Sequence, residues 1–150
     1  MKSVLTVFAL LASCVCAQTA SLKTALYALT SSDADRTFVT KQLADAIMPL
    51  ALPNFQPSRH SVEDFAAELA RSMAGKEPTI VQVGSLEKAI TEMMRGSVPN
   101  YTSTGHLRDA LSAIQIDSAD TIAITTRFLA IGEEVRGPDD LRLRKTWKTK

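Results

Sequence analysis

Apolar residues recur three and four positions apart through most of this chain, and this spacing constrains the fold more than any other feature. The first such stretch has one apolar face, made by Leu22, Ala25, Leu26 and Leu29. The segment Ile80–Val83 alone resembles a strand, and it lies inside a longer helical pattern. We therefore predict an all-α chain.

Two of the predicted helices open with a serine that is followed three residues later by aspartate, a variant of the capping box. Ser32–Asp35 opens the second helix, which Pro49 ends, and Ser61–Asp64 opens the third, which ends before Gly75. The expected inward residues are Phe38 or Val39, Leu43 and Ala46 or Ile47 in the second helix, and Val62, Phe65, Ala66, Leu69 and Met73 in the third.

Three further helices follow. Thr79 and Gln82 form a capping pair that opens the fourth, which ends at Gly96; His106 opens the fifth; and the sixth starts after Asp117. The expected inward residues of the fourth helix are Val83, Leu86, Ile90, Met93 and Met94. Those of the fifth helix are Leu107, Ala110, Leu111 and Ile114, and those of the sixth are Ala119, Ile122, Phe128, Ile131 and Val135. Because short connections favour antiparallel neighbours, we predict a small bundle or orthogonal array of about five to six short helices.

The first residues have the layout of an export signal, with Lys2 before the apolar run Val4–Ala12 and small residues after it. The run is shorter than the ~20 residues of a membrane-spanning helix, so we expect cleavage rather than retention. Cleavage after Ala17 makes residues 1–17 a signal peptide and leaves a soluble chain, and this is the site we favour.

The alternative is a lipoprotein leader of residues 1–13, because Leu11–Cys14 resembles a lipoprotein box. An acylated Cys14 would then anchor the domain to a membrane. We expect an exported chain in both cases. After cleavage at Ala17 it would be in the periplasm or outside the cell, and with an acylated Cys14 it would be held on a membrane. Since Cys14 and Cys16 are the only cysteines, the helical domain, residues 18–140, has no disulfide, thiol catalyst or cysteine metal site.

Two segments depart from the helical pattern. Residues 49–60 contain three prolines, which favours an extended or turning path whose Leu50, Leu52 and Phe55 pack over the bundle. The alternative hypothesis is that this segment binds a groove on a partner protein, with Phe55 as a contact residue.

The second segment, residues 141–150, is a basic tail that we expect to be flexible. It has five positive charges and no acid, whereas residues 18–140 hold 11 Lys or Arg and 16 Asp or Glu, a formal charge of −5. Such a tail could bind an anionic surface or polymer, or the acidic face of its own domain. The candidate contacts are Arg142, Arg144, Lys145, Trp147 and Lys148.

Signatures of catalysis are missing from the sequence. Neither His60 nor His106 has the neighbours of a metal site in the sequence, although Asp109 follows His106 by three residues. The pairs of adjacent acidic residues fit helix starts and turns, so they do not indicate catalysis. We find no hydrolase elbow, phosphate-binding loop or calcium loop, and no specific signal for nucleic acid, so no cofactor is predicted. Asn100-Tyr101-Thr102 matches a glycosylation acceptor, in a predicted loop, if the chain is eukaryotic.

The function itself stays unknown from the sequence. Our leading hypothesis is an exported, disulfide-free interaction module without a catalytic site, whose partner is a protein or an anionic surface. The alternative is a carrier of an apolar small molecule held between helices. The side chains that could line such a pocket are Met73, Met93, Met94, Phe38, Phe65 and Phe128. An enzyme with dispersed active-site residues is the third hypothesis and the weakest.

Overall fold

The computed structural model of the protein describes residues 21–136, which form six α-helices and no strand. The prediction of an all-helical fold is confirmed for this part of the chain. The helices are α2 (Leu22–Ala28), α3 (Arg36–Ile47), α4 (Arg59–Met73), α5 (Ile80–Arg95), α6 (Asn100–Ala113) and α7 (Ser118–Arg136), with a short 3-10 helix, η1 (Met48–Leu50), after α3. The predicted leader and the basic tail lie outside the described residues.

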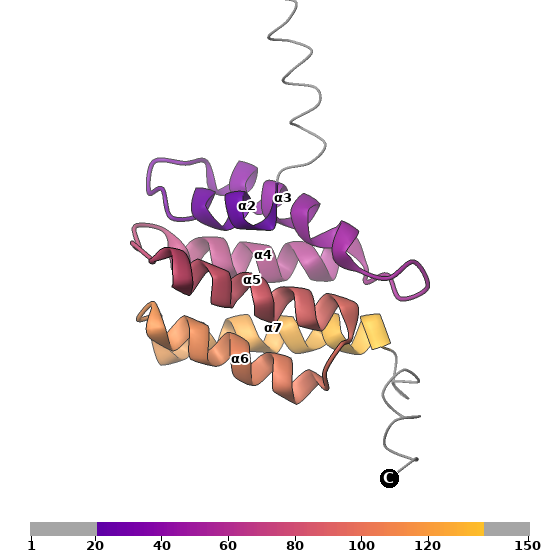
Figure 1. Ribbon diagram of the computed structural model, residues 1–150. Coiled ribbons are helices and arrows are strands. Elements are labelled where there is room, and N and C mark those ends of the chain that lie inside the picture. The colour runs from indigo at the N-terminus through magenta and orange to yellow at the C-terminus, as the bar shows by residue number, and fades with distance from the viewer. Residues whose placement is uncertain (1–20, 137–150) are drawn as a thin grey trace, which may run out of the picture.

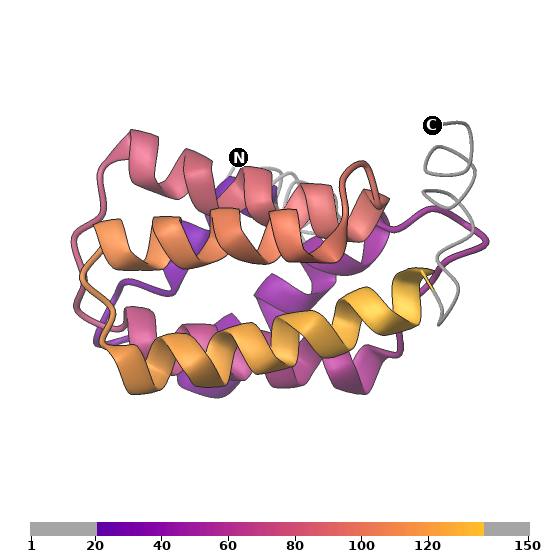
Figure 2. The same cartoon turned by 90° about the horizontal axis from the view of Figure 1, so that it is seen from below.

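The described helices pack in two layers, α2 with α5 and α6, and α3 with α4 and α7 (Figures 1 and 2). The chain changes layer from α2 to α3, from α4 to α5 and from α6 to α7, and stays in one layer across the other two connections. As a result α2 and α3 form one edge of the two-layer arrangement, and α6 and α7 form the opposite edge.

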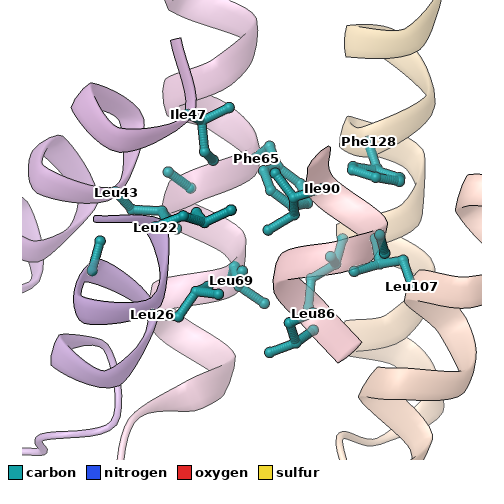
Figure 3. Packing of buried hydrophobic residues seen from close by; sticks show 14 of the residues in the cluster. Leu22, Leu26, Leu43, Ile47, Phe65, Leu69, Leu86, Ile90, Leu107 and Phe128 are labelled. Atoms are coloured by element: carbon teal, nitrogen blue, oxygen red, sulfur yellow. The ribbon is translucent and has the colours of Figure 1, made fainter. Parts of the chain in front are cut away.

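The core lies between the layers and is almost entirely aliphatic and aromatic (Figure 3). At its centre the rings of Phe65 and Phe128 lie 5.2 Å apart, centroid to centroid, and join α4 to α7. The predicted inward residues of the first and third helices are all buried, as are those of the fourth. The helical spacing therefore identified the inner faces of α2, α4 and α5 correctly.

The best predicted boundaries are those of α5. Thr79 accepts a hydrogen bond from the Gln82 amide, and the Gln82 side chain accepts one from the Thr79 amide, so the predicted capping box is confirmed. Gly96 ends the helix at φ 63°, and Gly75, after α4, has φ 79°, the left-handed conformation in which glycine is favoured.

The predicted starts of α3 and α4 were wrong. Asp35 is itself the N-cap of α3 and accepts hydrogen bonds from two backbone amides, whereas Ser32 lies outside the helix. Ser58 caps α4, so the N-cap lies three residues before the predicted cap Ser61, and His60 lies in the first turn of the helix. In both helices the N-cap is the residue whose side chain accepts hydrogen bonds from the first backbone amides. A serine followed by an acid three residues later was not a sufficient signal for the N-cap.

The start of α6 was also predicted too late, because the helix begins at Asn100 and not at His106. The apolar pattern begins at Leu107 because the earlier inward positions carry the polar residues Ser103 and Thr104, which are 0% and 3% exposed. The glycosylation motif thus lies in the first turn of α6 and not in a loop.

Two residues of α7 were placed on the wrong face, since Ala119 and Ile122 were predicted to be buried but are exposed, Ile122 to 66%. At the start of α3, where the sequence left Phe38 and Val39 as alternatives, Val39 is buried and Phe38 is 63% exposed. The buried stripe of α7 consists of Ile124, Phe128, Ile131 and Val135. Because α7 has apolar residues on two sides, the sequence pattern fitted more than one inner face.

The proline-rich segment contacts the core through two of the three side chains that were predicted to pack on it. Met48–Leu50 forms a 3-10 turn, and Leu50 and Phe55 pack, partly buried, against the core. Leu52 keeps an intermediate exposure. Phe55 therefore contacts the core of its own chain.

Gly132 lies where α7 packs closely against the other layer. A Cβ atom at this position would be 2.6 Å from the Met93 sulfur and 3.0 Å from the Asn100 side chain. A Cβ atom at Gly84 or at Gly105 would have nothing within 4 Å.

We expect Gly132→Ala to lower the free energy of unfolding by about 1–3 kcal/mol through overpacking. Gly84→Ala and Gly105→Ala should instead raise it by about 0.4–1 kcal/mol, because alanine restricts the unfolded chain. Urea unfolding of the three variants checks this, and a stabilised Gly132→Ala would contradict the close approach.

Candidate interaction surface

Among the described residues, three of the six large apolar side chains that face solvent lie on α6 and α7, and the others are Phe38 on α3 and Ile80 and Val81 on α5. Tyr101 on α6 is 73% exposed, and Ile122 and Leu129 on α7 are 66% and 39% exposed. Ile122 and Leu129 are two helical turns apart, so they lie on one side of α7, with Thr126 between them. We call these four residues the α6–α7 edge.

The contact between Asn100 and Gly132 sets the register of the two helices. Tyr101 follows Asn100, and Leu129 lies about one turn before Gly132 on α7. Tyr101 and Leu129 therefore lie at nearly the same level, and Ile122 lies two turns further along the same edge. The apolar residues of the two helices thus extend over a shared surface.

Three charged residues of α7, Asp120, Arg127 and Glu134, pair with α4 or its N-cap, and the outward side is uncharged over most of its length. Arg71 of α4 bonds to Asp120 at 2.8 Å, Arg127 lies 3.6 Å from Asp64, and Glu134 accepts hydrogen bonds from the backbone amide of Ser58 and the hydroxyl of Ser61. The outward positions between residues 119 and 130 carry Ala119, Ile122, Ala123, Thr126, Leu129 and Ala130. The outward side of α7 therefore offers an uncharged surface on which another apolar surface could pack.

Glu134 also gives the contact between α7 and α4 a dependence on pH. Burial opposes the charged form, but the hydrogen bonds from Ser61 and Ser58 outweigh it and lower the pKa of Glu134 below its usual value. A lowered pKa means that the carboxylate stabilises the fold above the pKa of the unfolded chain, about 4.3, and that this contribution is lost as the pH falls through the lower folded value.

We therefore expect Glu134→Gln to lower stability at pH 7 by about 0.5–1.5 kcal/mol, the usual net contribution of a hydrogen bond, and to have little effect at pH 2. Glu133→Gln is the matched control, because Glu133 is exposed and has no hydrogen-bond partner among the described residues. Urea unfolding at both pH values is the measurement. An equal effect of the two variants at pH 7 would contradict a specific role of Glu134.

Two depressions lie away from this edge. One, of about 600 Å³, follows the outside of α3 and α4 and is lined by Arg36, Thr37, Thr40, Lys41, His60, Glu63, Asp64, Ala67 and Arg71. The other, of about 410 Å³, lies beside α5 next to the start of α2 and is lined by Leu22, Leu50, Gly84, Glu87, Lys88, Thr91, Glu92 and Ser97. The residues that line the first are polar or charged except for Ala67, whereas the second has two leucines on its wall.

The side chains predicted to line a carrier pocket occupy other places. Met73, Met93, Met94, Phe65 and Phe128 are at most 1% exposed and belong to the core, and Phe38 points to solvent. Neither of the two depressions described above includes any of these six side chains.

The two histidines pair with acids near them. His60 Nε2 lies 3.3 Å from Asp64, one turn away, and His106 Nδ1 lies 2.7 Å from Glu92 on α5, not beside Asp109 as the sequence spacing indicated. Within residues 21–136, no three His, Cys, Asp or Glu side chains gather in a way that could hold a metal ion. Over the same range, every helix is too short or too polar for a membrane span.

The remaining predicted site residues fall into two groups. Asn100 has a buried side-chain oxygen, and its amide faces Gly132, so a glycan at Asn100 would have to displace α7. Cys14 and the basic residues Arg142, Arg144, Lys145, Trp147 and Lys148 lie outside the described residues.

Sequence reasoning missed Tyr101 and Leu129 and assigned Ile122 to the core. The signal that could have found them is the second apolar side of α7, where Ile122 and Leu129 recur at a spacing of seven beside several alanines.

No protein-family model, curated protein or solved structure matches this chain.

Proposed function

We propose that this chain is an exported helical interaction module that binds another protein through the α6–α7 edge. The observation that carries the proposal is the exposure of Tyr101, Ile122 and Leu129 on α6 and α7, the two helices that form one edge of the two-layer arrangement. Contact with a partner would remove this apolar surface from water, which is worth about 25 cal/mol per Å². The partner surface that fits is itself apolar, such as one side of an amphipathic helix.

Export is part of the proposal and rests on the sequence of residues 1–17. A binding surface made of side chains on regular helices suits a domain without disulfides, because the core beneath α6 and α7 already fixes the positions of these side chains.

Photo-crosslinking in the producing cell tests the proposal. A photoreactive phenylalanine analogue replaces Ile122 in one variant and Phe38 in a control, since the two side chains are exposed to 66% and 63% but lie at opposite edges. We expect a discrete crosslinked species from position 122 and none from position 38. Failure to obtain any adduct at position 122, or the same adducts at both positions, would contradict the α6–α7 edge as the binding surface.

A second candidate function, the carrier of an apolar small molecule, is favoured by the 410 Å³ depression with Leu22 and Leu50 on its wall. Native mass spectrometry of the exported protein tests it. A discrete extra mass that is lost on denaturation, and is absent from a Gly84→Leu variant in which the depression is filled, would support a carrier. The mass of the bare chain would contradict it.

A further inference from the structure

We infer that the partner of the α6–α7 edge is a second copy of this chain, with the two α7 helices packed antiparallel about a two-fold axis at Thr126. The inference rests on the proposed function and adds the identity of the partner. It starts from the outward residues of α7, whose order along the helix is self-complementary.

In an antiparallel pair centred on Thr126, each residue faces the one at equal distance on the other side of the centre. Ile122 then faces Ala130 of the second copy, and Leu129 faces Ala123. Each large exposed side chain thus meets an alanine, which leaves room for it and lets the helices approach to the usual 8–10 Å between axes. Thr126, at the centre, faces Thr126.

The charges do not oppose the same arrangement, because the outward positions of α7 between Ala119 and Ala130 carry none. Glu133 would face Ala119, in the first turn of the second α7, where the carboxylate of Asp117 already accepts a hydrogen bond from the backbone amide of Asp120. Asp120 in that turn is already paired with Arg71 of its own chain. The two Glu133 carboxylates would be separated by about 21 Å along the axis, so they would not repel each other strongly.

The register of α6 extends the contact beyond α7. Tyr101 lies level with Leu129, so each copy would add a tyrosine beside the α7 pair, one at either end of the interface. Aromatic side chains at the margin of an apolar contact exclude water from it and are common in protein interfaces. The two-fold arrangement would therefore cover all three of the exposed side chains on which the proposed function rests.

Disulfide trapping tests the inference in the full chain carrying Cys14→Ser and Cys16→Ser. Helices at 8–10 Å place the two facing Cα atoms at position 126 about 3.4–5.4 Å apart, which overlaps the range of a disulfide. A cysteine at 129 is displaced from its symmetry mate by about 9 Å along the axis, beyond that range. We expect Thr126→Cys to crosslink under mild oxidation at least about tenfold faster than Leu129→Cys or Phe38→Cys.

Sedimentation velocity of the wild-type chain and of Ile122→Asp completes the test. The wild type should sediment as a dimer whose population grows with concentration, and Ile122→Asp should sediment as a monomer with an unchanged far-UV circular dichroism spectrum. A wild-type chain that stays monomeric up to about 1 mM would overturn the inference, as would faster crosslinking at position 129 than at 126. If the chain is monomeric but a crosslinker at position 122 captures another protein, the inference fails and the proposed function stands; if it captures nothing, both fail.

Discussion

Phe128→Ala is expected to lower the free energy of unfolding by about 3–5 kcal/mol, the range for removing a large aromatic side chain from a core. Phe128 is 1% exposed and packs against Phe65, so its removal would leave a cavity between α7 and α4 at the centre of the molecule. Since a domain of this size is stable by about 5–15 kcal/mol, the loss would take a large part of the total.

Urea unfolding followed by circular dichroism measures this change. Phe38→Ala is the matched control, because it removes the same side chain from a position that is 63% exposed, and it should alter stability by less than about 0.5 kcal/mol. Similar losses in the two variants would mean that Phe128 does not lie in the core.

Arg36→Ala should also be strongly destabilising, by about 2–4 kcal/mol, because Arg36 joins three segments through backbone carbonyl groups. Its guanidinium donates to the carbonyl oxygen of Leu29 at 2.9 Å and to that of Ala70 at 2.8 Å, and it also donates to Ser31 and Ala34. These bonds satisfy carbonyls near the ends of α2 and α4, which lack partners within their own helices.

Two further variants separate this role from charge alone. Arg36→Lys keeps the charge but cannot make the same set of bonds, so it should recover only part of the stability. Arg108→Ala removes an exposed arginine of α6 and should change stability by less than about 0.5 kcal/mol. An Arg36→Ala variant as stable as Arg108→Ala, judged by its urea midpoint, would show that the carbonyl contacts contribute nothing.

The sequence predicted well those features that depend on residues close together in the chain. The capping box of Thr79 and Gln82 and the glycine end at Gly96 are of this kind, since each places donors and acceptors within one turn. The apolar stripe of α4 was predictable for the same reason, because Val62 to Met73 repeat regularly and have polar neighbours.

Features that depend on tertiary contacts were not predictable. Nothing near Arg36 indicates that it will reach the carbonyl of Ala70, and nothing near Ser58 indicates that Glu134, far along the chain, will bond to its amide. The start of α6 was missed because Ser103 and Thr104 point inward, against the rule that inward positions are apolar.

The α6–α7 edge was missed for a related physical reason. Periodicity distinguishes an apolar side of a helix from a polar one, but it does not tell which of two apolar sides faces the core and which faces solvent. In α7 that choice is made by the packing of Phe128 on Phe65 and by Gly132, which admits Met93 and Asn100. Once this side is inward, Ile122 and Leu129 must point away from the molecule.

Methyl NMR with a soluble paramagnetic agent tests most directly whether another molecule covers this edge. Ile122 and Ile80 are 66% and 70% exposed, so in dilute solution the agent should broaden both methyl signals to a similar extent. We predict that raising the protein concentration protects Ile122 and Leu129 from broadening while Ile80 stays accessible. Equal broadening of Ile122 and Ile80 at every concentration, or protection of Ile122 already in the dilute monomer, would contradict an edge that is exposed in one chain and covered by a second.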